Sequence, residues 1–234
     1  MISCITLFRK KDGITPEALK DLMQGEYAEK CLSVKGLHGY EQNYVFLKEL
    51  GDAYHEDVTA DAFTIERYDT LHEYEEAMKS TEYKIVLAAR DAFSCHTESF
   101  TCLENVSIPC NITPDCKKKI SLLQRTAPKV SFEDYTREWL VIHSGCMIKM
   151  PKDIFFGYNQ HLVIDRMVSG KHVPYEENPV DGILELYFSD AAAVSNAFKT
   201  TPEGQLTVSH RKEFMCGVDP FLVDFKIFLS KSET

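Results

Sequence analysis

The sequence repeats itself at a spacing of roughly 120 residues, and this repeat constrains the fold more than any other feature. Near the starts of the two copies, two pairs of identical residues both lie 116 positions apart (125 − 9 and 133 − 17). A later pair lies 121 positions apart (221 − 100), as small loop insertions would cause. The matched residues are Arg9 and Arg125, Glu17 and Glu133, Gly39-Tyr40 and Gly157-Tyr158, and Phe100 and Phe221. The chain therefore predicts two copies of one folded unit.

Each copy has the pattern of strand, helix, strand, strand, helix, strand. In the first copy we expect strands at 2–9, 39–46, 63–68 and 100–108, and helices at 15–32 and 71–89. In the second copy a helix should begin at Ser131, followed by strands at 157–164, 183–188 and 221–229 and a helix at 191–210. This βαββαβ order is that of a ferredoxin-like unit, whose antiparallel sheet carries both helices on one face.

The fold class expected is therefore α+β, with two tandem ferredoxin-like units at 1–108 and 118–234. A linker at 109–117, with two prolines and other turn residues, would join them. Both helices of a unit lie on one face of its sheet, so the other face needs a cover. Two such sheets in one chain can cover each other and close an α+β barrel, whose interior we expect to be the binding pocket.

Composition excludes several partners. The formal net charge is −10 with scattered basic residues, which argues against binding to nucleic acid or to an anionic membrane surface. No apolar run approaches the roughly 18 residues needed to cross a bilayer, so we expect a cytoplasmic protein. The eight cysteines form no CxxC pair and no zinc-site spacing, which favours free thiols. A monomer and a homodimer are both compatible with the fold, because an exposed sheet edge could pair with a second chain.

The two copies differ at one position pair. Where the second copy has Trp139 and His143, the first has Met23 and Tyr27. Residues four apart share a helical face, so Trp139 and His143 should point the same way. If the protein has a single working site, this difference places the site in the second copy and makes the first a degenerate one.

Motifs of the second copy resemble the EthD-like branch of the dimeric α+β barrel superfamily. The residues that carry the resemblance are Tyr135, Trp139, His143, Gly157-Tyr158-Asn159-Gln160, Asp181-Gly182-Ile183 and Glu185. The resemblance implies two ferredoxin-like halves around an apolar barrel pocket, and chemistry that needs no cofactor, such as cyclisation, decarboxylation, dehydration, isomerisation or quinone-forming oxygenation. Some branches with two fused halves bind haem.

His143 is the first candidate for catalysis. An imidazole with an unperturbed pKa is a suitable general base or acid near neutral pH, and the end of its helix could face the mouth of the barrel. The alternative is a structural histidine that ties the helix to a strand. We expect another histidine, His210, to lie at the surface.

Alternation along the strands supplies the remaining candidates. In the strand at 157–164, either Tyr158 and Gln160 or His161 faces the barrel, and Tyr40 and Gln42 match the first pair in the other copy. In the strand at 183–188, the opposite face is uniformly apolar, so Glu185 and Tyr187 should point into the barrel. There Glu185 could exchange protons or orient His143, or could instead pair with Arg125. We expect the Lys117-Lys118-Lys119 run to be solvated.

These residues predict an enzyme that moves a proton on an aromatic or polyketide-like molecule, with no cofactor and no metal. The predicted catalytic residues are His143, Tyr158 and Glu185. The predicted substrate-binding residues are Trp139, Gln160, Tyr187, Tyr40, Gln42, Tyr27 and Arg125. Two alternatives remain open: an oxygenase, either cofactor-free or with haem bound by a histidine such as His143, and a non-catalytic binding protein for a hydrophobic metabolite.

Overall fold

The computed structural model describes residues 1–48 and 58–230 and contains the two expected units. The first unit consists of β1 (Ile2–Lys10), α1 (Pro16–Leu22), the π-helix η1 (Met23–Tyr27), α2 (Ala28–Leu32), β2 (Gly39–Lys48), β3 (Ala62–Tyr68), α3 (Leu71–Lys79), α4 (Thr81–Phe93) and β4 (Ser94–Ile108). The second consists of β5 (Lys117–Arg125), α5 (Phe132–Arg137), the π-helix η2 (Glu138–His143), α6 (Ser144–Met147), β6 (Phe155–Val168), β7 (Lys171–His172), β8 (Gly182–Phe188), α7 (Ala191–Thr200), α8 (Pro202–Phe214) and β9 (Met215–Leu229).

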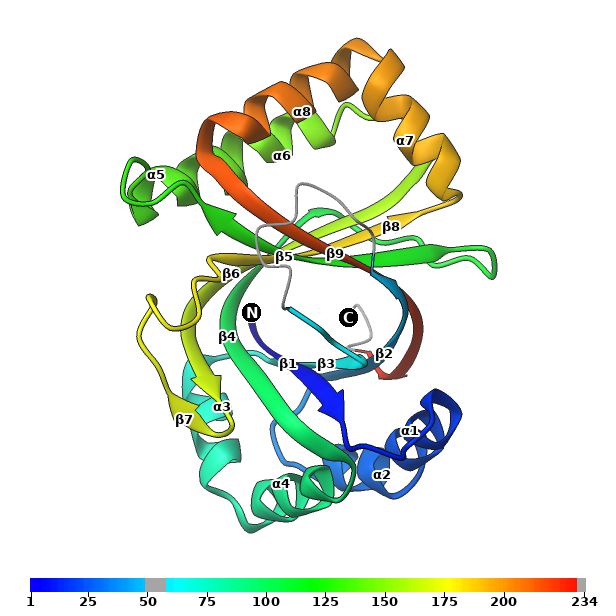
Figure 1. The fold of residues 1–234 in the computed structure, drawn as a ribbon, viewed down its shortest axis with the longest axis vertical. Coiled ribbons are helices and arrows are strands. Elements are labelled where there is room, and N and C mark those ends of the chain that lie inside the picture. The colour runs from blue at the N-terminus through cyan, green and yellow to red at the C-terminus, as the bar shows by residue number, and fades with distance from the viewer. Residues whose placement is uncertain (49–57, 231–234) are drawn as a thin grey trace.

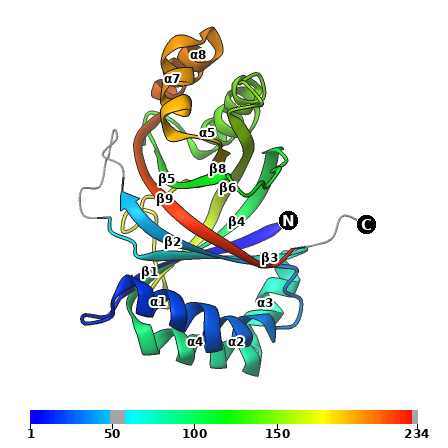
Figure 2. The same cartoon turned by 90° about the vertical axis from the view of Figure 1, so that its right-hand side faces the viewer.

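The strands form one antiparallel sheet that closes into a barrel. Their order is β4-β1-β3-β2-β9-β5-β8-β6-β7, and β4 also pairs with β6. The two units therefore join along both edges, at the β2–β9 and β4–β6 pairings. The first unit's helices lie on one side of the barrel and the second unit's on the other (Figures 1 and 2). The predicted α+β barrel of two ferredoxin-like units is confirmed.

Local sequence explains where the helices begin and break. Thr15 and Ser131 cap the first helix of each unit with their hydroxyl oxygens, as expected. The second helix of each unit, predicted as continuous, is broken in two at Ser80 and at Thr201. Both residues have extended backbones and accept a hydrogen bond from the helix that follows, and Pro202 favours a helix start after Thr201.

Both units contain a π-helix in the middle of the first helical region, and a glutamine anchors each one. Gln42 Nε2 donates to the Met23 carbonyl oxygen at 2.7 Å, and Gln160 Nε2 donates to the Trp139 carbonyl oxygen at 2.8 Å. A π-helix shifts the hydrogen-bond pattern of an α-helix, and such segments are frequent at functional sites. Gln42 therefore joins η1 to β2, and Gln160 joins η2 to β6 in the same way.

The interior of the barrel is filled by side chains from both units. One part is apolar and includes Ile5, Phe63, Phe100, Ile183 and Phe221, all fully buried. Other inward-facing positions are charged and are described below. The expectation of an apolar pocket inside the barrel is therefore wrong as far as the described residues show, because their inward-facing side chains form a packed core. Among the helices that the structure describes, none is long and apolar enough to cross a bilayer.

Candidate active site

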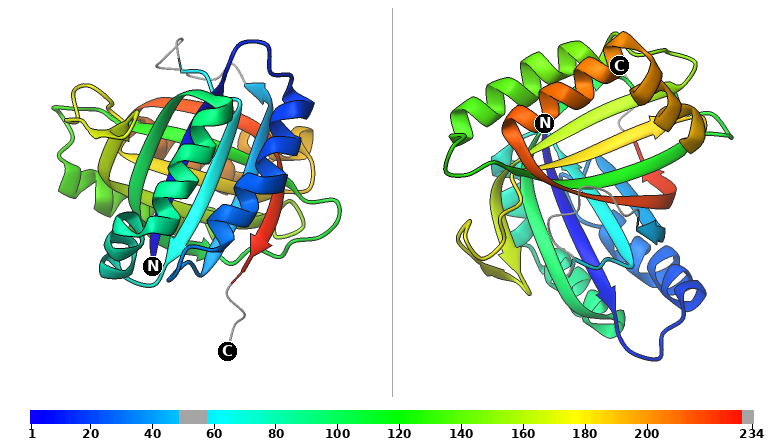
Figure 3. Two further views of the ribbon diagram at one scale, coloured as in Figure 1. Left: turned by 90° about the horizontal axis from the view of Figure 1, so that it is seen from below. Right: turned by 45° about the horizontal axis from the view of Figure 1, so that its top comes forward.

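A large cleft lies outside the barrel, between the helices and the outer face of the second unit's sheet. This cleft has a volume of about 1320 Å³. Its lining comes from strands β5, β8 and β9 on one side and from η2, α7 and α8 on the other. Figure 3 (right) shows the green and orange helices of the second unit lying over these strands. Its apolar wall includes Leu123, Met147, Leu184, Leu186, Phe188, Val194 and Phe198. A cavity of this size can hold a polycyclic or elongated organic molecule.

Trp139, His143 and Tyr158 place polar atoms in the cleft wall, which also contains polar side chains such as Ser121, Gln205 and Thr207. The indole N–H of Trp139 and the hydroxyl of Tyr158 are buried and make no hydrogen bond of good geometry among the described residues, although the side chains of Trp139 and Gln160 lie close enough to the Tyr158 hydroxyl to lower its pKa slightly. Burial raises the pKa of Tyr158, so its hydroxyl remains protonated and able to donate. Unpartnered buried donors are costly in a folded protein, and a ligand oxygen would satisfy them.

His143 is held by a second histidine and a carboxylate. The Nδ1 atoms of His143 and His210 lie 3.5 Å apart, with the rings stacked, and His210 Nε2 lies 3.0 Å from Glu138 Oε2. If His210 donates from Nε2 to Glu138, its Nδ1 can accept from Nδ1–H of His143. Nε2 of His143 then carries the free lone pair.

The imidazole of His143 is neutral at physiological pH. Burial lowers its pKa to about 3, and the nearby His210 and Arg211 add to the lowering. This corrects the expectation of an unperturbed pKa. The base form is therefore present throughout the physiological range, although its proton affinity in the empty cleft is low.

The equivalent space of the first unit is closed by aromatic packing. Tyr27, which takes the place of His143, contacts Phe93 edge-on with ring centroids 5.1 Å apart and contacts Phe8 at 6.2 Å. Met23, in the place of Trp139, is fully buried. The sequence difference between the copies thus corresponds to a filled core in one unit and an open cleft in the other.

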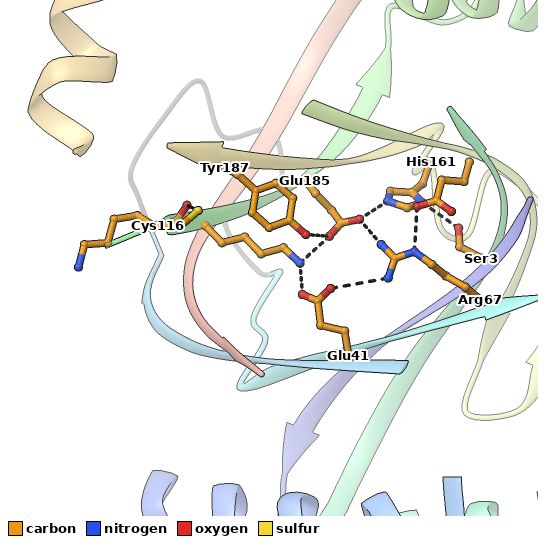
Figure 4. A network of polar contacts seen from close by, with 10 residues as sticks. Ser3, Glu41, Arg67, Cys116, His161, Glu185 and Tyr187 are labelled. Carbon is orange, nitrogen blue, oxygen red and sulfur yellow. Dashed lines mark hydrogen bonds and ion pairs between the residues drawn. The ribbon is translucent and has the colours of Figure 1, made fainter. Parts of the chain in front are cut away.

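A second polar cluster lies inside the barrel (Figure 4). Glu185 contacts Lys118 at 2.5 Å, Arg67 at 2.8 Å, His161 Nε2 at 2.6 Å and the hydroxyl of Tyr187 at 2.8 Å. Burial alone would raise the pKa of Glu185, but Lys118 and Arg67 outweigh it and hold that pKa well below the usual range.

First-unit residues complete this barrel network. Glu41 pairs with Lys118 and, at 3.6 Å, with Arg67. Arg67 also bonds Glu104 at 2.9 Å, and Ser3 bonds the ring of His161 at 2.8 Å. The network therefore ties the two units together across the barrel.

Glu104, His161 and Glu185 have ligand atoms within 4.8 Å of one another, which is a spacing compatible with a metal ion. The guanidinium of Arg67, however, bonds both carboxylates. The positive charge of Arg67 would repel a metal cation at this place. The residues therefore fit a salt-bridge network better than a metal centre.

Haem would fit the cleft rather than the barrel. The cleft is large and mostly apolar, and the neutral imidazole of His143 is the side chain that would bind the iron, with His210 and Glu138 behind it. Bound haem would supply one-electron and oxygen chemistry at this wall.

The structure separates the predicted catalytic and substrate-binding residues into two places. His143, Tyr158 and Trp139 line the cleft, whereas Glu185 and Tyr187 point into the barrel, as the alternation of their strand predicts. Since adjacent strand residues face opposite sides, Glu185 cannot join Tyr158 and His143 on the helix-covered face. The idea that Glu185 orients His143 from inside the barrel is wrong.

Other predicted contacts are also corrected. His161, not Tyr158 and Gln160, faces the barrel. Gln160 and Gln42 anchor the π-helices, and Tyr40 and Tyr27 lie in the first unit's core. Arg125 pairs with Asp181 at 3.3 Å, so the alternative pairing with Glu185 is wrong.

Sequence reasoning missed several residues. Lys118 is buried in the barrel instead of solvated, and His210 contacts His143 instead of lying at the surface. Lys118 alternates with Ile120 and Leu122, and that pattern could have revealed its inward orientation. The other missed residues are Arg67, Glu41 and Glu104, which face the barrel interior from the first copy. The equivalent positions of the second copy carry no charge, so the repeat gave no signal for them.

No protein-family model matches this chain, and no curated protein is similar to it in sequence. Solved structures do match it in fold. A protein of Lactobacillus acidophilus NCFM described as a monooxygenase shares 10% identity at a TM-score of 0.62, with 99% of this chain and 96% of that chain covered. A protein of Fusobacterium nucleatum with the same description shares 11% identity at a TM-score of 0.64, with 97% of this chain and 93% of that chain covered. An anthrone oxidase-like protein shares 11% identity at a TM-score of 0.63, with 99% of this chain and 94% of that chain covered. At these identities the likeness shows the fold: a tandem ferredoxin-like α+β barrel over the length of the chain.

Proposed function

We propose that the protein is an enzyme that binds a flat, mostly apolar, oxygenated molecule in the second unit's cleft and removes a proton from it with His143. The observation that carries the proposal is the neutral imidazole of His143 in an apolar wall beside two buried donors, the indole N–H of Trp139 and the hydroxyl of Tyr158. An apolar pocket with a few convergent polar groups is the usual form of a small-molecule active site. The resemblance of the second copy's motifs to the EthD-like branch also supports the proposal.

The chemistry follows from the donors and the base. The hydroxyl of Tyr158 and the N–H of Trp139 donate to a carbonyl or phenol oxygen of the bound molecule and stabilise negative charge there. Nε2 of His143 then accepts a proton from an acidified C–H or O–H bond. The new positive charge on His143 is stabilised through its Nδ1–H, by His210 and Glu138.

Such an anion can expel a neighbouring hydroxyl group as water, which takes back the proton from His143, or can attack a carbonyl carbon of the same molecule and close a ring. Loss of carbon dioxide from a carboxylate would form an anion of the same kind directly, and the same two donors would stabilise it. We place this reaction in a cytoplasmic small-molecule pathway.

Oxygenation is the second candidate, because fold relatives are described as monooxygenases and as anthrone oxidase-like. In that case the electron-rich anion formed by His143 would reduce oxygen directly. In a haem form His143 would hold the iron instead of acting as the base, and the haem would supply the one-electron and oxygen chemistry. Oxygen uptake separates the two candidates, and a Soret band in protein from iron-supplied cells would identify the haem form.

The test is turnover of a panel of hydroxylated aromatic and polyketide-like compounds, followed by absorbance and by an oxygen electrode. Loss of a general base typically lowers the rate by about 10²- to 10⁴-fold, and we expect that loss for His143→Gln. The control is His172→Gln, which changes an exposed histidine outside the cleft lining. Full activity of His143→Gln on a compound that the wild type converts would reject the proposed base.

A further inference from the structure

The aromatic part of the cleft wall packs over a strand position that has no side chain. Gly182 is the first residue of β8 and is buried. A Cβ atom added to it would lie 2.3 Å and 2.5 Å from Cζ3 and Cη2 of Trp139, and 2.6 Å from the hydroxyl oxygen of Tyr135. Real Cβ atoms essentially never come within 3.0 Å of a neighbouring atom. The two aromatic side chains therefore occupy space that only a glycine leaves open.

The first copy fills the equivalent space with different volumes. Ala62 is the first residue of β3 and lies 120 positions before Gly182 (182 − 62). Leu19 and Met23 lie 116 positions before the two aromatic residues (135 − 19 and 139 − 23). All three are buried in one core cluster of the first unit. A methyl group on the strand thus accompanies two smaller side chains in one copy, and a bare strand position accompanies two rings in the other. Such compensating volumes are what a close-packed interior requires.

The contact with Gly182 fixes one edge of the indole of Trp139, and the donor lies elsewhere on the same rigid ring. Cζ3 and Cη2 belong to the six-membered ring, whereas the N–H belongs to the five-membered ring. The Trp139 side chain lies close enough to the Tyr158 hydroxyl to lower the pKa of that hydroxyl slightly. On the main-chain side, Gln160 holds the carbonyl oxygen of Trp139 at 2.8 Å. A methyl group added at Gly182 would therefore turn the ring about its own side-chain bonds and carry the N–H away from Tyr158.

We propose that Gly182 is a positioning residue for the cleft: by leaving room for the Trp139 ring, it holds the indole donor beside the Tyr158 hydroxyl, where both can reach one oxygen of a bound molecule. Gly182 is not among the described residues that line the cleft, whereas Trp139 is. The glycine therefore acts on the cleft through Trp139 and touches no reacting atom. This inference rests on the proposed function, because it names a residue on which the proposed pair of donors depends.

The test is Gly182→Ala in the full chain, followed through the fluorescence of Trp139, which is the only tryptophan. The ring is buried and borders the open cleft, so we expect it to move towards water. Its emission should shift to longer wavelength, and its quenching by acrylamide should increase. A misplacement of about 1 Å can lower a rate by about 10²-fold, and we expect a loss of up to that size in turnover.

Gly145→Ala is the matched control. It adds the same methyl group to α6 of the same unit, at a place where a Cβ atom meets no described neighbour within 4 Å. Its emission and turnover should stay as in the wild type. Wild-type emission and quenching in folded Gly182→Ala would overturn the inference and leave the proposed function standing.

Trp139→Phe separates the inference from the proposed function, because it removes the donor without adding a methyl group. If Trp139→Phe is impaired but Gly182→Ala turns over at the wild-type rate, only the inference fails. If Trp139→Phe itself keeps the wild-type rate, the inference and the donor role of Trp139 both fail, while His143→Gln still tests the base.

The first copy supplies a second variant in case Gly182→Ala does not fold. Gly182→Ala/Tyr135→Leu/Trp139→Met reproduces the combination of Ala62, Leu19 and Met23, and we expect it to fold because the added methyl group then meets smaller side chains. If this variant also failed to fold, the rings would not be what requires a glycine at position 182, and the inference would be overturned.

Discussion

At the scale of single residues, two buried groups titrate with opposite effects on stability. His143 has a pKa lowered to about 3 by burial, and Glu66 has a pKa raised to about 7 by burial, which the hydrogen bond from Tyr68 only partly offsets. Both lie between helices and sheet, in the second and the first unit respectively. Each group should therefore change the pH dependence of the free energy of unfolding in a different pH range or direction.

For His143, the unfolded state binds a proton near pH 6.5 and the folded state only near pH 3. Its contribution to stability is thus complete above pH 6.5 and is lost as the pH falls, by at most about 1.4 kcal/mol per pH unit. We expect His143→Leu to flatten the pH dependence of the free energy of unfolding between pH 6.5 and 4, measured by urea denaturation. His72→Gln, at an exposed histidine, should keep the wild-type slope. An unchanged slope in His143→Leu would show that the imidazole is hydrated.

Glu66 should act in the other direction. The folded state holds the proton up to about pH 7, whereas the unfolded carboxyl loses it near pH 4.5. The contribution of this group is present below pH 4.5 and is lost as the pH rises through 7. Glu66→Gln should therefore gain stability relative to wild type as the pH increases from 4.5 to 7, by up to about 1.4 kcal/mol per unit. A constant difference in unfolding free energy across this range would contradict the buried, protonated carboxyl.

Residue patterns predicted part of the strand orientation correctly. Leu184, Leu186 and Phe188 form a uniformly apolar face, so the opposite face with Glu185 and Tyr187 could be assigned to the barrel. The strand around Tyr158 mixes polar and apolar residues on both faces, and alternation alone left its orientation open. Lys118 looked solvated because its neighbours are lysines. Its burial depends on Glu41, which is 77 positions away in the chain and comes from the other unit.

At the scale of secondary structure elements, the π-helices decide what faces each sheet. The Gln160 amide joins η2 to β6 through the Trp139 carbonyl, and its oxygen accepts from Ser144 Oγ at 2.6 Å. Gln42 makes the corresponding bond to η1. The spacing of Trp139 and His143 predicted a shared face, but the opening between helices and sheet depends on how far the second unit's helices stand from β5 and β9. No local pattern encodes that distance.

The glutamines allow a matched comparison within one molecule. Gln160→Leu leaves the Trp139 carbonyl and Ser144 without this partner, so we expect a loss of about 1–3 kcal/mol in unfolding free energy. Hydrogen exchange should become faster in η2, and turnover of a compound that the wild type converts should fall. Gln42→Leu should cost a similar free energy but accelerate exchange in η1 and leave that turnover unchanged. If either variant showed faster exchange in both π-helices, each glutamine would not be stabilising its own π-helix alone.

At the scale of the whole molecule, the barrel network connects the units. Lys118 of the second unit lies between Glu41 and Glu185 and is almost fully buried. Replacing it leaves buried carboxylates without their nearest cation. Removal of one partner from a buried ion pair typically costs about 3–5 kcal/mol.

We therefore expect Lys118→Met to lower the unfolding free energy by this amount and Lys118→Met/Glu41→Gln to recover part of it. Lys117→Met, at an exposed neighbour, should have little effect. The measurement is chemical denaturation of the full chain at neutral pH. A Lys118→Met protein as stable as the wild type would show that the network contributes nothing to joining the units.

The closure of the barrel along both unit edges, β2 with β9 and β4 with β6, has a consequence for how such a protein can change over time. In a symmetric pair of identical chains, any substitution appears in both halves, so a residue that closes one cleft closes the other. A covalent tandem removes this constraint. One half can trade its cleft for a tightly packed core and act as scaffold, while the other tolerates buried donors without partners and a histidine that resists protonation. The first unit can then supply most of the stability, while the second unit keeps the cleft in which we propose the reaction.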